Sequence, residues 1–363
     1  MSPPPAIAVY VSSHGFGHAV RVSEVVASLL ERSPTCRIHV RATAPQWLFP
    51  PSGTRLTIES SRTDVGLVQR DALAIDFAAT MKELDALEAS WERRLDEEAA
   101  WLRAIHASVV LIDIPPLGVA AADRAGVPAI ALGNFSWDWI YGAYVARDRG
   151  FARHAERAAA CYGQARLLLR LPFHADMAAF RSVVDIPLIA RRSAWPRAEA
   201  RRRLGLAATA RPLVLLSFGG LGLETIDVSR LGAMPEIEFI ATERFANAPP
   251  NLTCLARTQL DYTMLLSACD AVITKPGYGI VAASLVNGVR VLYATRDDFP
   301  ETPILVRALE EHGTAEVVHA TDLLRGEIRG PLERLLARQV VATEFAADGA
   351  TRVAELLARE LGT

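Results

Sequence analysis

Short apolar runs alternate with stretches of helically spaced apolar residues along most of this chain, and this alternation constrains its fold more than any other feature. The first run, at 7–11, precedes a helical series at 22–30, and runs at 109–113, 212–218 and 271–274 repeat the pattern. A parallel strand needs a crossover connection, usually a helix, before the next parallel strand. The alternation therefore predicts an α/β fold built on doubly wound parallel sheets.

Length and local composition predict how the chain divides. Its 363 residues exceed the roughly 250–300 residues at which single cores stop growing, which predicts two domains. The Arg- and Pro-rich stretch at 172–211 lacks a regular pattern, so we place the boundary within it, between a domain at 1–185 and a domain at 186–345. The amphipathic segment at 346–363 predicts a last helix that returns to the first domain.

Two further segments are predicted to be helical from their apolar spacing. Over 77–106 the apolar residues recur every three to four positions, which predicts one long helix or two joined helices. The segment at 151–169 is predicted to be a single helix that ends before Pro172.

Charge and cysteine content exclude several classes of protein. The formal net charge of −2 argues against a nucleic-acid or anionic-membrane surface. The four cysteines have neither metal-ligand spacing nor disulfide density, as in proteins of a reducing compartment. The N-terminus lacks the pattern of a signal peptide, and no run reaches the ~18 apolar residues of a membrane span. We therefore expect a soluble cytoplasmic protein with no nucleic-acid partner, no membrane segment and no metal.

The turn at 13–21 follows the first predicted strand and opens the first predicted helix. In an open α/β sheet such turns lie at the carboxyl ends of the strands, where ligands bind. Its two glycines allow a tight turn, and His14 and His18 are of the type that titrates near neutral pH. The turn is not the dinucleotide-binding fingerprint, because the third glycine is missing. A ligand-binding turn and a Gly-rich turn with surface histidines both fit this spacing.

His18 and Asp113 are candidate catalytic partners because each follows or ends a predicted strand. If the two strands are neighbours, the carboxylate can orient the imidazole, and an oriented imidazole can deprotonate an attacking hydroxyl. Asp113 has a second interpretation as a cap in the turn before Pro115. The spacing alone does not choose between them, and His14 is a second candidate base.

An aromatic segment at 134–141 follows the strand predicted at 127–132. Its aromatic residues lie among Asn134, Ser136 and Asp138, a mixture suited to the wall of a sugar or acceptor site. The same pattern fits a helix start, with Ser136 as the N-cap and the aromatic rings in the core.

Two Gly-rich turns in the second half of the chain are candidate phosphate sites. The turns at 219–220 and 277–279 each lie between a predicted strand and a predicted helix, whose first N–H groups bind anions. Lys275, one of only two lysines, can add a positive charge. Together they favour a nucleotide-diphosphate site, with plain structural turns as the alternative.

Seven segments, spread in order over nearly the whole chain, carry a family resemblance: GFGHAVR at 15–21, VQRDAL at 68–73, NFSWDWIY at 134–141, AFR at 179–181, IPL at 186–188, GYG at 277–279 and RDDF at 296–299. With them the chain resembles the GT-B glycosyltransferase superfamily. Within that superfamily it is most similar to the glycosyltransferase-like domain that precedes the kinase domain of plant L-arabinokinases, and to the free-standing bacterial relatives of that domain. It also resembles, more distantly, the lipid-linked N-acetylglucosaminyltransferase of peptidoglycan synthesis.

The resemblance implies a GT-B fold, in which two Rossmann-like domains with parallel sheets face each other across an interdomain cleft. It implies that the first domain holds the acceptor and the second holds a nucleotide-sugar donor. His18 falls where many members carry the catalytic base, and Asp113 falls where plant small-molecule glycosyltransferases carry the Asp that orients it.

The resemblance also implies which residues bind the two substrates. The expected donor residues lie in the phosphate loops, at the nucleotide base and near the sugar: Gly219, Gly220, Leu255, Ala256, Lys275, Gly277, Tyr278, Gly279, Asp297 and Asp298. The expected acceptor residues come from the first domain: His14, Phe16, Asn134, Trp137 and Asp138.

Ala283 departs from the pattern of the superfamily. Related sequences commonly carry Glu at this position, six residues after the glycine that matches Gly277, where it holds the nucleotide ribose. Ser284 is the nearest polar residue, but on a helix it points about 100° away from position 283. The identity of the nucleotide and the strength of donor binding are therefore open.

Three functions fit these observations. The first is an inverting, metal-independent hexosyl- or N-acetylhexosaminyltransferase that uses a nucleotide-diphosphate sugar, UDP-sugar first, and a hydroxyl or amine acceptor. The second is nucleotide-sugar hydrolysis, because some GT-B hydrolases carry a similar Gly-x-Gly-His-x-x-Arg turn. The third is a non-catalytic nucleotide-sugar-binding or regulatory module, which the alanine at 283 favours.

Overall fold

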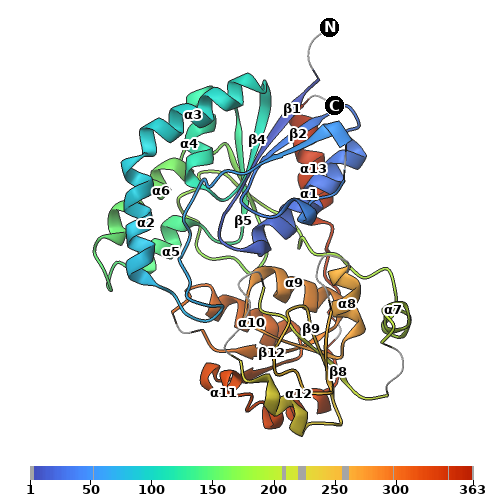
Figure 1. The fold of residues 1–363 in the computed structure, drawn as a ribbon. Helices are drawn as coiled ribbons and strands as arrows, with labels where there is room; N and C mark the ends of the chain where they lie inside the picture. Colours follow the sequence, from blue (N-terminus) through green and yellow to red (C-terminus); the bar gives the residue numbers. More distant parts are fainter. Residues whose placement is uncertain are drawn as a thin grey trace. The chain divides into compact units, whose positions relative to one another are not determined.

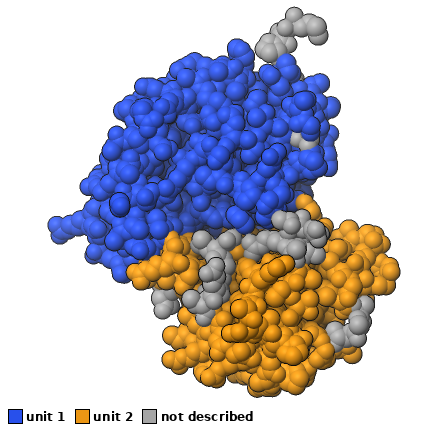
Figure 2. Space-filling model, in the orientation of Figure 1, with its two compact units in different colours: residues 1–68, 76–189, 346–363 blue, residues 69–75, 190–345 orange. Residues whose placement is uncertain are grey.

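The computed structural model describes residues 4–51, 53–206, 210–219, 226–255, 261–296, 298–341 and 343–361. The chain forms two compact units, drawn in different colours in Figure 2. Unit 1 comprises Met1–Val68, Asp76–Ile189 and Ala346–Thr363, and unit 2 comprises Gln69–Ile75 and Ala190–Phe345.

The described part of unit 1 is built on a seven-stranded sheet in which every pair of neighbouring strands is parallel. The strands lie in the order β3-β2-β1-β4-β5-β6-β7. Their bounds are β1 (Ala6–Val11), β2 (Arg37–Arg41), β3 (Leu56–Glu59), β4 (Ala107–Asp113), β5 (Ala129–Gly133), β6 (Leu167–Arg170) and β7 (Val183–Asp185). All of β1 and the second half of β4 are buried, which explains their continuous apolar sequences.

Helices cover both faces of this sheet (Figure 1). Helices α1 and α13 pack against each other on one face, and α3, α4 and α6 lie on the other. The α-helices of unit 1 are α1 (Phe16–Arg32), α2 (Phe77–Ala89), α3 (Trp91–Ala104), α4 (Pro116–Ala125), α5 (Trp137–Ala143), α6 (Phe151–Tyr162) and α13 (Gly349–Glu360). Two short 3₁₀ turns accompany them, η1 (Gln46–Leu48) and η2 (Gly53–Arg55).

The helical predictions for this unit meet different outcomes. The segment at 77–106 forms two helices, α2 and α3, which meet at Ser90. The single helix predicted over 151–169 is wrong, because α6 ends at Tyr162 and residues Leu167–Arg170 form β6. The apolar residues from 167 to 169 belong to a buried strand of the sheet.

Unit 2 is built on a second parallel sheet, which has six strands in its described part. Their order is β10-β9-β8-β11-β12-β13. The strands are β8 (Leu213–Leu216), β9 (Glu238–Ala241), β10 (Leu252–Cys254), β11 (Ala271–Thr274), β12 (Arg290–Ala294) and β13 (Ala315–Val318). Around them lie α7 (Arg197–Arg203), η3 (Val228–Ala233), α8 (Tyr262–Ala268), α9 (Tyr278–Asn287), α10 (Thr302–His312), α11 (Ala320–Leu324) and α12 (Arg329–Ala337).

A short segment from the first half of the sequence belongs to unit 2. Residues 69–75 are grouped with this unit, and Ala72 lies fully buried in its hydrophobic core. The Asp71 carboxylate shapes this segment by accepting hydrogen bonds from the N–H groups of Leu73 (2.7 Å) and Ala74 (3.0 Å). No helix within the described ranges is long and apolar enough to cross a bilayer.

Candidate functional site

The sharp turn between β1 and α1 places His18 in the first turn of the helix. The turn depends on Gly15, which has φ +82°, a backbone conformation that residues with a Cβ rarely adopt. Gly15 is the N-cap, α1 begins at Phe16, and His18 lies on the buried face of the helix with 6% of its surface exposed.

Asp113 is the last residue of β4 and lies beside this turn. β1 and β4 are parallel neighbours in which Val11 pairs with Asp113, and the Ser12 N–H donates to the Asp113 carbonyl at 2.6 Å. The carboxylate is fully buried, and its Oδ1 lies 2.8 Å from Nδ1 of His18. The structure therefore brings the two predicted catalytic residues into contact, and their roles stay predictions.

Arg21 binds the same carboxylate, which the sequence did not reveal. Its Nε donates to Oδ2 of Asp113 at 2.5 Å, and its Nη2 donates to Oδ1. Its Nη1 donates to Oδ1 of Asn134 at 3.0 Å. Arg21 is three residues after His18 and so lies on the same face of α1. This spacing within the segment at 15–21 was the one feature of the sequence that could have indicated that Arg21 belongs to the site.

The contacts of this cluster indicate which ring nitrogen of His18 carries a proton. Burial alone would raise the pKa of Asp113, but the charges and hydrogen bonds of Arg21 and His18 outweigh burial and hold that pKa below its ordinary value. Nδ1 of His18 lies 2.8 Å from Oδ1 of Asp113 and 3.0 Å from Nη2 of Arg21. Nη2 already donates to Oδ1 of Asp113, and an ionised carboxylate only accepts. We therefore assign a proton to Nδ1, directed at Asp113, so that in the neutral ring the lone pair is on Nε2.

A second buried carboxylate, Asp64, holds the other side of the turn and was also missed from the sequence. Asp64 accepts hydrogen bonds from the Ser13 N–H at 2.8 Å and from Nε1 of Trp137 at 2.9 Å. Burial raises the pKa of Asp64, and these hydrogen bonds offset only part of that effect. Asp64 follows no regular strand or helix, so no periodicity marked it.

His14 and Phe16 lie on the outer part of the turn. Nδ1 of His14 accepts a hydrogen bond from the Leu67 N–H at 3.2 Å, and its ring stands edge-on to Trp137 with centroids 5.2 Å apart. The rings of His14 and His18 are 6.4 Å apart. Phe16 is half-buried and packs edge-on against Trp47, whose ring is 47% exposed. An apolar surface thus flanks the N-terminus of α1.

The aromatic segment begins α5 with most of its rings inside unit 1. Trp137 is only 1% exposed and stacks on Tyr141 at 5.6 Å. Asn134 is buried with its side-chain oxygen held by Arg21. Asp138 is half-buried, and burial raises its pKa. Ser136 is the N-cap residue but makes no side-chain capping bond.

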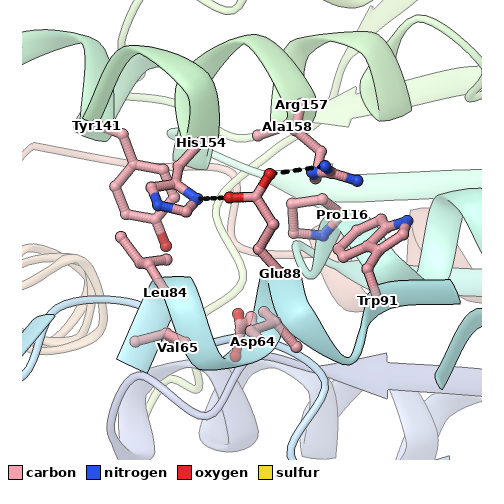
Figure 3. Close-up of a pocket in the computed structure, with 11 residues that line it drawn as sticks. Asp64, Val65, Leu84, Glu88, Trp91, Pro116, Tyr141, His154, Arg157 and Ala158 are labelled. Atoms are coloured by element: carbon pink, nitrogen blue, oxygen red, sulfur yellow. Dashed lines mark hydrogen bonds and ion pairs between the residues drawn. The ribbon is translucent and has the colours of Figure 1, made fainter. Parts of the chain in front are cut away.

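Figure 3 shows a small pocket in unit 1 between α2 and α6. Its volume is about 30 Å³, room for one or two waters and too small for a sugar nucleotide. His154 and Glu88 meet in it and, with Asp85, form the one set of described residues placed closely enough to bind a metal. Arg153 pairs with Asp85, and Arg157 pairs with Glu88 at 2.8 Å. Because the carboxylates of Asp85 and Glu88 are already paired with arginines, we interpret the cluster as a set of ion pairs that joins α2 to α6.

In unit 2, the loop after β11 carries the predicted phosphate residues. Lys275 is partly buried, and its Nζ lies 3.8 Å from where a Cβ on Gly277 would stand, next to the first turn of α9. Gly277 is the N-cap, Tyr278 is buried, and Gly279 has open space where a side chain would be. Neither Gly277 nor Gly279 has a positive φ. The backbone conformation therefore does not require glycine at either position.

Arg296, in the loop after β12, lies near Lys275 and was not among the predicted site residues. It is 3% exposed, its Nη1 donates to the Pro276 carbonyl at 3.0 Å, and its guanidinium lies over the Phe299 ring. Burial lowers the pKa of Lys275 to about 7, and the charge of Arg296 adds to that effect. Lys275 and Arg296 thus lie within electrostatic range of each other in the loops after β11 and β12, and the Glu301 carboxylate is 4.0 Å from Arg296.

The other predicted donor residues lie in several loops of unit 2. Gly219 follows β8, is exposed and has φ +78°. Leu255 is half-buried, with its N–H bonded to the Ala241 carbonyl at 2.8 Å, and Asp298 is exposed. Ser284 is buried on α9, so it does not replace the missing carboxylate of position 283. Gly220, Ala256 and Asp297 lie outside the described residues.

Comparison with known proteins finds similarity in sequence and in fold. No family model matches the chain. L-arabinokinase of Arabidopsis thaliana is 35% identical over 337 residues, which make up 91% of this chain and 32% of that protein. The chain therefore spans about a third of the length of this curated relative.

Solved structures match over nearly the full chain. The glycotransferase of kitacinnamycin has a TM-score of 0.68 and 19% identity, covering 99% of this chain and 100% of the other. CalG4, the calicheamicin glycosyltransferase, has a TM-score of 0.66 and 16% identity, covering 99% and 98%. The glycosyltransferase VinC in complex with dTDP has a TM-score of 0.56 and 16% identity, covering 99% and 95%. At these identities the likeness concerns the fold alone.

Proposed function

Because this chain has the GT-B fold of glycosyltransferases, we propose that it transfers a sugar from a nucleotide-diphosphate sugar to a hydroxyl or amine acceptor. The observation that carries the proposal is the buried contact of 2.8 Å between His18 and Asp113, at the carboxyl edge of a parallel sheet. Ligands of open α/β sheets bind at that edge.

The proposed reaction is a single displacement with inversion at the anomeric carbon. Nε2 of His18 accepts the proton of the acceptor hydroxyl as the oxygen forms its bond to the anomeric carbon. The bond from that carbon to the diphosphate oxygen breaks, and its electron pair leaves with the diphosphate. Asp113 acts only through His18, by holding the Nδ1–H.

The proposed donor site lies in unit 2 and needs no metal ion. The first N–H groups of α9 and the ammonium of Lys275 face the position of the diphosphate, and they stabilise the charge that develops as it leaves. The lack of side chains at Gly277 and Gly279 supports this assignment, because neither backbone conformation nor packing accounts for both glycines. The other described residues of the proposed donor site are Gly219, Leu255, Tyr278 and Asp298.

The donor is proposed to be a UDP-hexose or UDP-N-acetylhexosamine, and the acceptor an apolar or ring-bearing molecule. The half-exposed Phe16 and Trp47 beside the turn support an apolar acceptor. Of the solved structures named above, VinC is in complex with dTDP, a nucleoside diphosphate, which supports a nucleotide-sugar donor for this chain as well.

A non-catalytic nucleotide-binding module is the second candidate, favoured by Ala283. A carboxylate on the ribose hydroxyls would be a charge-assisted anchor, and this chain lacks it at that position. Hydrolysis of the nucleotide sugar would use the same His18 with water as the acceptor.

A thermal-shift screen of nucleoside diphosphates separates these functions. We expect UDP or another diphosphate to raise the melting temperature, because a ligand that binds only the folded state stabilises it. Transfer to an acceptor from UDP-glucose or UDP-N-acetylglucosamine supports the transferase, and release of free sugar without acceptor supports the hydrolase. Binding without either reaction supports the non-catalytic module. No stabilisation by any diphosphate would rule out all three.

A further inference from the structure

We propose that Arg21 is a positioning residue that keeps the imidazole of His18 neutral. Its guanidinium compensates the negative charge of Asp113, so the carboxylate orients the imidazole without favouring a second proton on the ring. This inference rests on the proposed function of His18 as the base. It concerns a residue for which neither the resemblance nor the comparisons imply a role.

The first argument is the number of contacts that Arg21 makes with Asp113. Nε and Nη2 of the guanidinium bind the two different carboxylate oxygens, a two-pronged arrangement that fixes the plane of the carboxylate. His18 then meets Oδ1 of a carboxylate whose orientation is already set, and Nη2 of Arg21 lies 3.0 Å from the same Nδ1 of His18. The positive guanidinium therefore lies directly beside the imidazole, where it disfavours a second positive charge. Nη1 of Arg21 donates a hydrogen bond to Asn134, which follows β5. The guanidinium therefore links α1 to the carboxyl ends of both β4 and β5.

The second argument is charge balance in a buried space. Exposed surface amounts to 0% for Asp113, 4% for Arg21 and 6% for His18. A buried charge is strongly unfavourable unless an opposite charge compensates it. With Arg21 present, Asp113 is compensated while His18 is neutral. With Arg21 absent, the imidazolium would be the remaining counter-charge, and Nε2 would already carry the proton that the base must accept.

The other ionisable groups near His18 do not replace Arg21. Asp64 interacts electrostatically with His18, but burial favours its neutral form. His14 has its Nδ1 bonded to a backbone N–H and its ring 6.4 Å from that of His18. Of the charged groups described around the imidazole, Arg21 is thus the cation that compensates Asp113.

The test is ¹⁵N NMR of ring-labelled histidine at pH 7.5, in the wild type and in R21M. In the wild type we expect His18 to give the spectrum of a neutral ring with the proton on Nδ1. In R21M we expect a doubly protonated ring at the same pH. An R21M spectrum identical to that of the wild type would overturn the proposal.

R41M is the matched control. Arg41 also pairs with a carboxylate of unit 1, Glu59 at 2.7 Å, and its side chain is 16% exposed. Among the described residues its partners are Glu59, Glu98 and the Trp101 ring, and not His18 or Asp113. We expect R41M to leave the His18 spectrum unchanged. The proposal would be wrong if R41M shifted that spectrum as much as R21M does, since the loss of any carboxylate-paired arginine of unit 1 would then have the same effect.

Kinetics give a second readout that a purely structural role would not produce. We expect R21M to lower kcat by about 100-fold, at the lower end of what a general base contributes, with the donor KM within about threefold. If R21M does not fold, R21K carries the test: a lysine reaches one carboxylate oxygen, so kcat falls by about tenfold and KM stays unchanged. Equal kcat in the wild type and R21K would then overturn the proposal.

The two readouts distinguish this proposal from the proposed function. If the wild type binds no nucleotide and transfers no sugar, the function fails, and the NMR comparison still decides whether Arg21 sets the protonation of His18. If the wild type transfers sugar and R21M matches it in both kcat and spectrum, the role of Arg21 fails and the function stands.

Discussion

At the scale of single residues, the candidate site of unit 1 is a set of buried polar side chains whose charges and hydrogen bonds compensate one another. The Asp113 carboxylate accepts hydrogen bonds from Arg21 and His18, and Arg21 also donates one to the side-chain oxygen of Asn134. Such a network is stabilising only when each member is satisfied, because removal of one partner leaves a buried charge alone. Its stability and its chemistry therefore depend on the same residues.

Replacement of Asp113 by alanine is expected to destabilise the protein in a pH-dependent way. At pH 7 the variant leaves Arg21 buried without a counter-charge, which costs about 3–5 kcal/mol of unfolding free energy. The folded pKa of Asp113 lies below its unfolded value of about 3.9. Its contribution is therefore complete above pH 4 and is lost as the pH falls through the folded pKa.

Urea unfolding of the wild type and D113A between pH 7 and pH 3 measures this difference. We expect the gap between the two proteins to narrow below about pH 4. D123A is the control, because Asp123 is exposed on α4, and its loss should change stability by no more than about 0.5 kcal/mol. A D113A protein as stable as D123A at pH 7 would contradict the account.

Individual residues of the site were predictable to different degrees. The contact of His18 with Asp113 follows from the order of a doubly wound sheet, in which β1 and β4 are neighbours. Arg21 was not predictable as part of it, because arginine supplies nearly all of the positive charge of this chain and is mostly on its surface. Asp64 lies in an irregular stretch, where no pattern indicates burial.

At the scale of elements, the loop between β11 and α9 joins a helix N-terminus to a lysine with a lowered pKa. Burial and Arg296 lower the pKa of Lys275 to about 7, so the ammonium is largely present below pH 7 and lost above it. Because a bound diphosphate interacts with the ammonium, its affinity is expected to fall as the pH rises above 7.

Isothermal titration with UDP from pH 7.5 to pH 9 tests this expectation. The phosphate groups, with a second pKa of about 6, are fully ionised in this range and add no pH dependence of their own. We expect the dissociation constant of the wild type to rise by up to about tenfold per pH unit. In K275R it should stay within about twofold, because arginine stays charged.

The control for Lys275 is the other lysine of the chain. Lys82 is exposed on α2 in unit 1, so K82R should reproduce the pH dependence of the wild type. The same pH dependence in K275R as in the wild type would show that Lys275 does not contact the phosphates.

At the start of α13, close packing against the backbone explains why residue 349 is a glycine. A Cβ on Gly349 would lie 2.2 Å from the Pro187 carbonyl oxygen, closer than any real contact. The Gly349 N–H donates to the Leu188 carbonyl at 3.0 Å, so the helix begins directly on this segment. From there Val353 and Leu357 are buried in unit 1, where α13 packs against α1.

Gly349→Ala is therefore expected to lower the unfolding free energy of unit 1 by about 1–3 kcal/mol and to raise hydrogen exchange in α13. The control is Gly142→Ala in α5, where a Cβ meets nothing within 4 Å. That substitution should be neutral or should stabilise by about 0.5–1 kcal/mol. Equal stability of the two variants would show that the close approach at Gly349 is relieved without cost.

The elements themselves were predicted best where their periodicity was unambiguous. The bounds of β11 agree with the apolar run predicted at 271–274, whereas the apolar residues of β6 were assigned to the helix predicted at 151–169. A short buried strand and a buried helical segment have the same continuous apolar composition, so periodicity does not separate them. Only pairing with β5, which is non-local, identifies β6 as a strand.

At the scale of the whole molecule, the two parallel sheets share one strand order over six strands, which β7 extends in unit 1, and they carry different parts of the proposed chemistry. Unit 1 carries His18 and its partners, and unit 2 carries the loop of Lys275. The repeat of architecture was visible in the alternation of strands and helices. The assignment of residues 69–75 to unit 2 was not, because their place depends on the burial of Ala72 in a core formed mainly by much later residues.

The central claim is that His18 is the base of a glycosyl transfer, and its most direct test is the rate of UDP release from UDP-glucose and UDP-N-acetylglucosamine by the wild type and H18A. The assay is run with a panel of phenols, alcohols, amines and sugars as acceptors. We predict that the wild type releases UDP with an accepted member of the panel. We predict that H18A binds the same donor within about twofold but releases UDP at least about 100-fold more slowly. Equal rates of UDP release by the two proteins would contradict the claim.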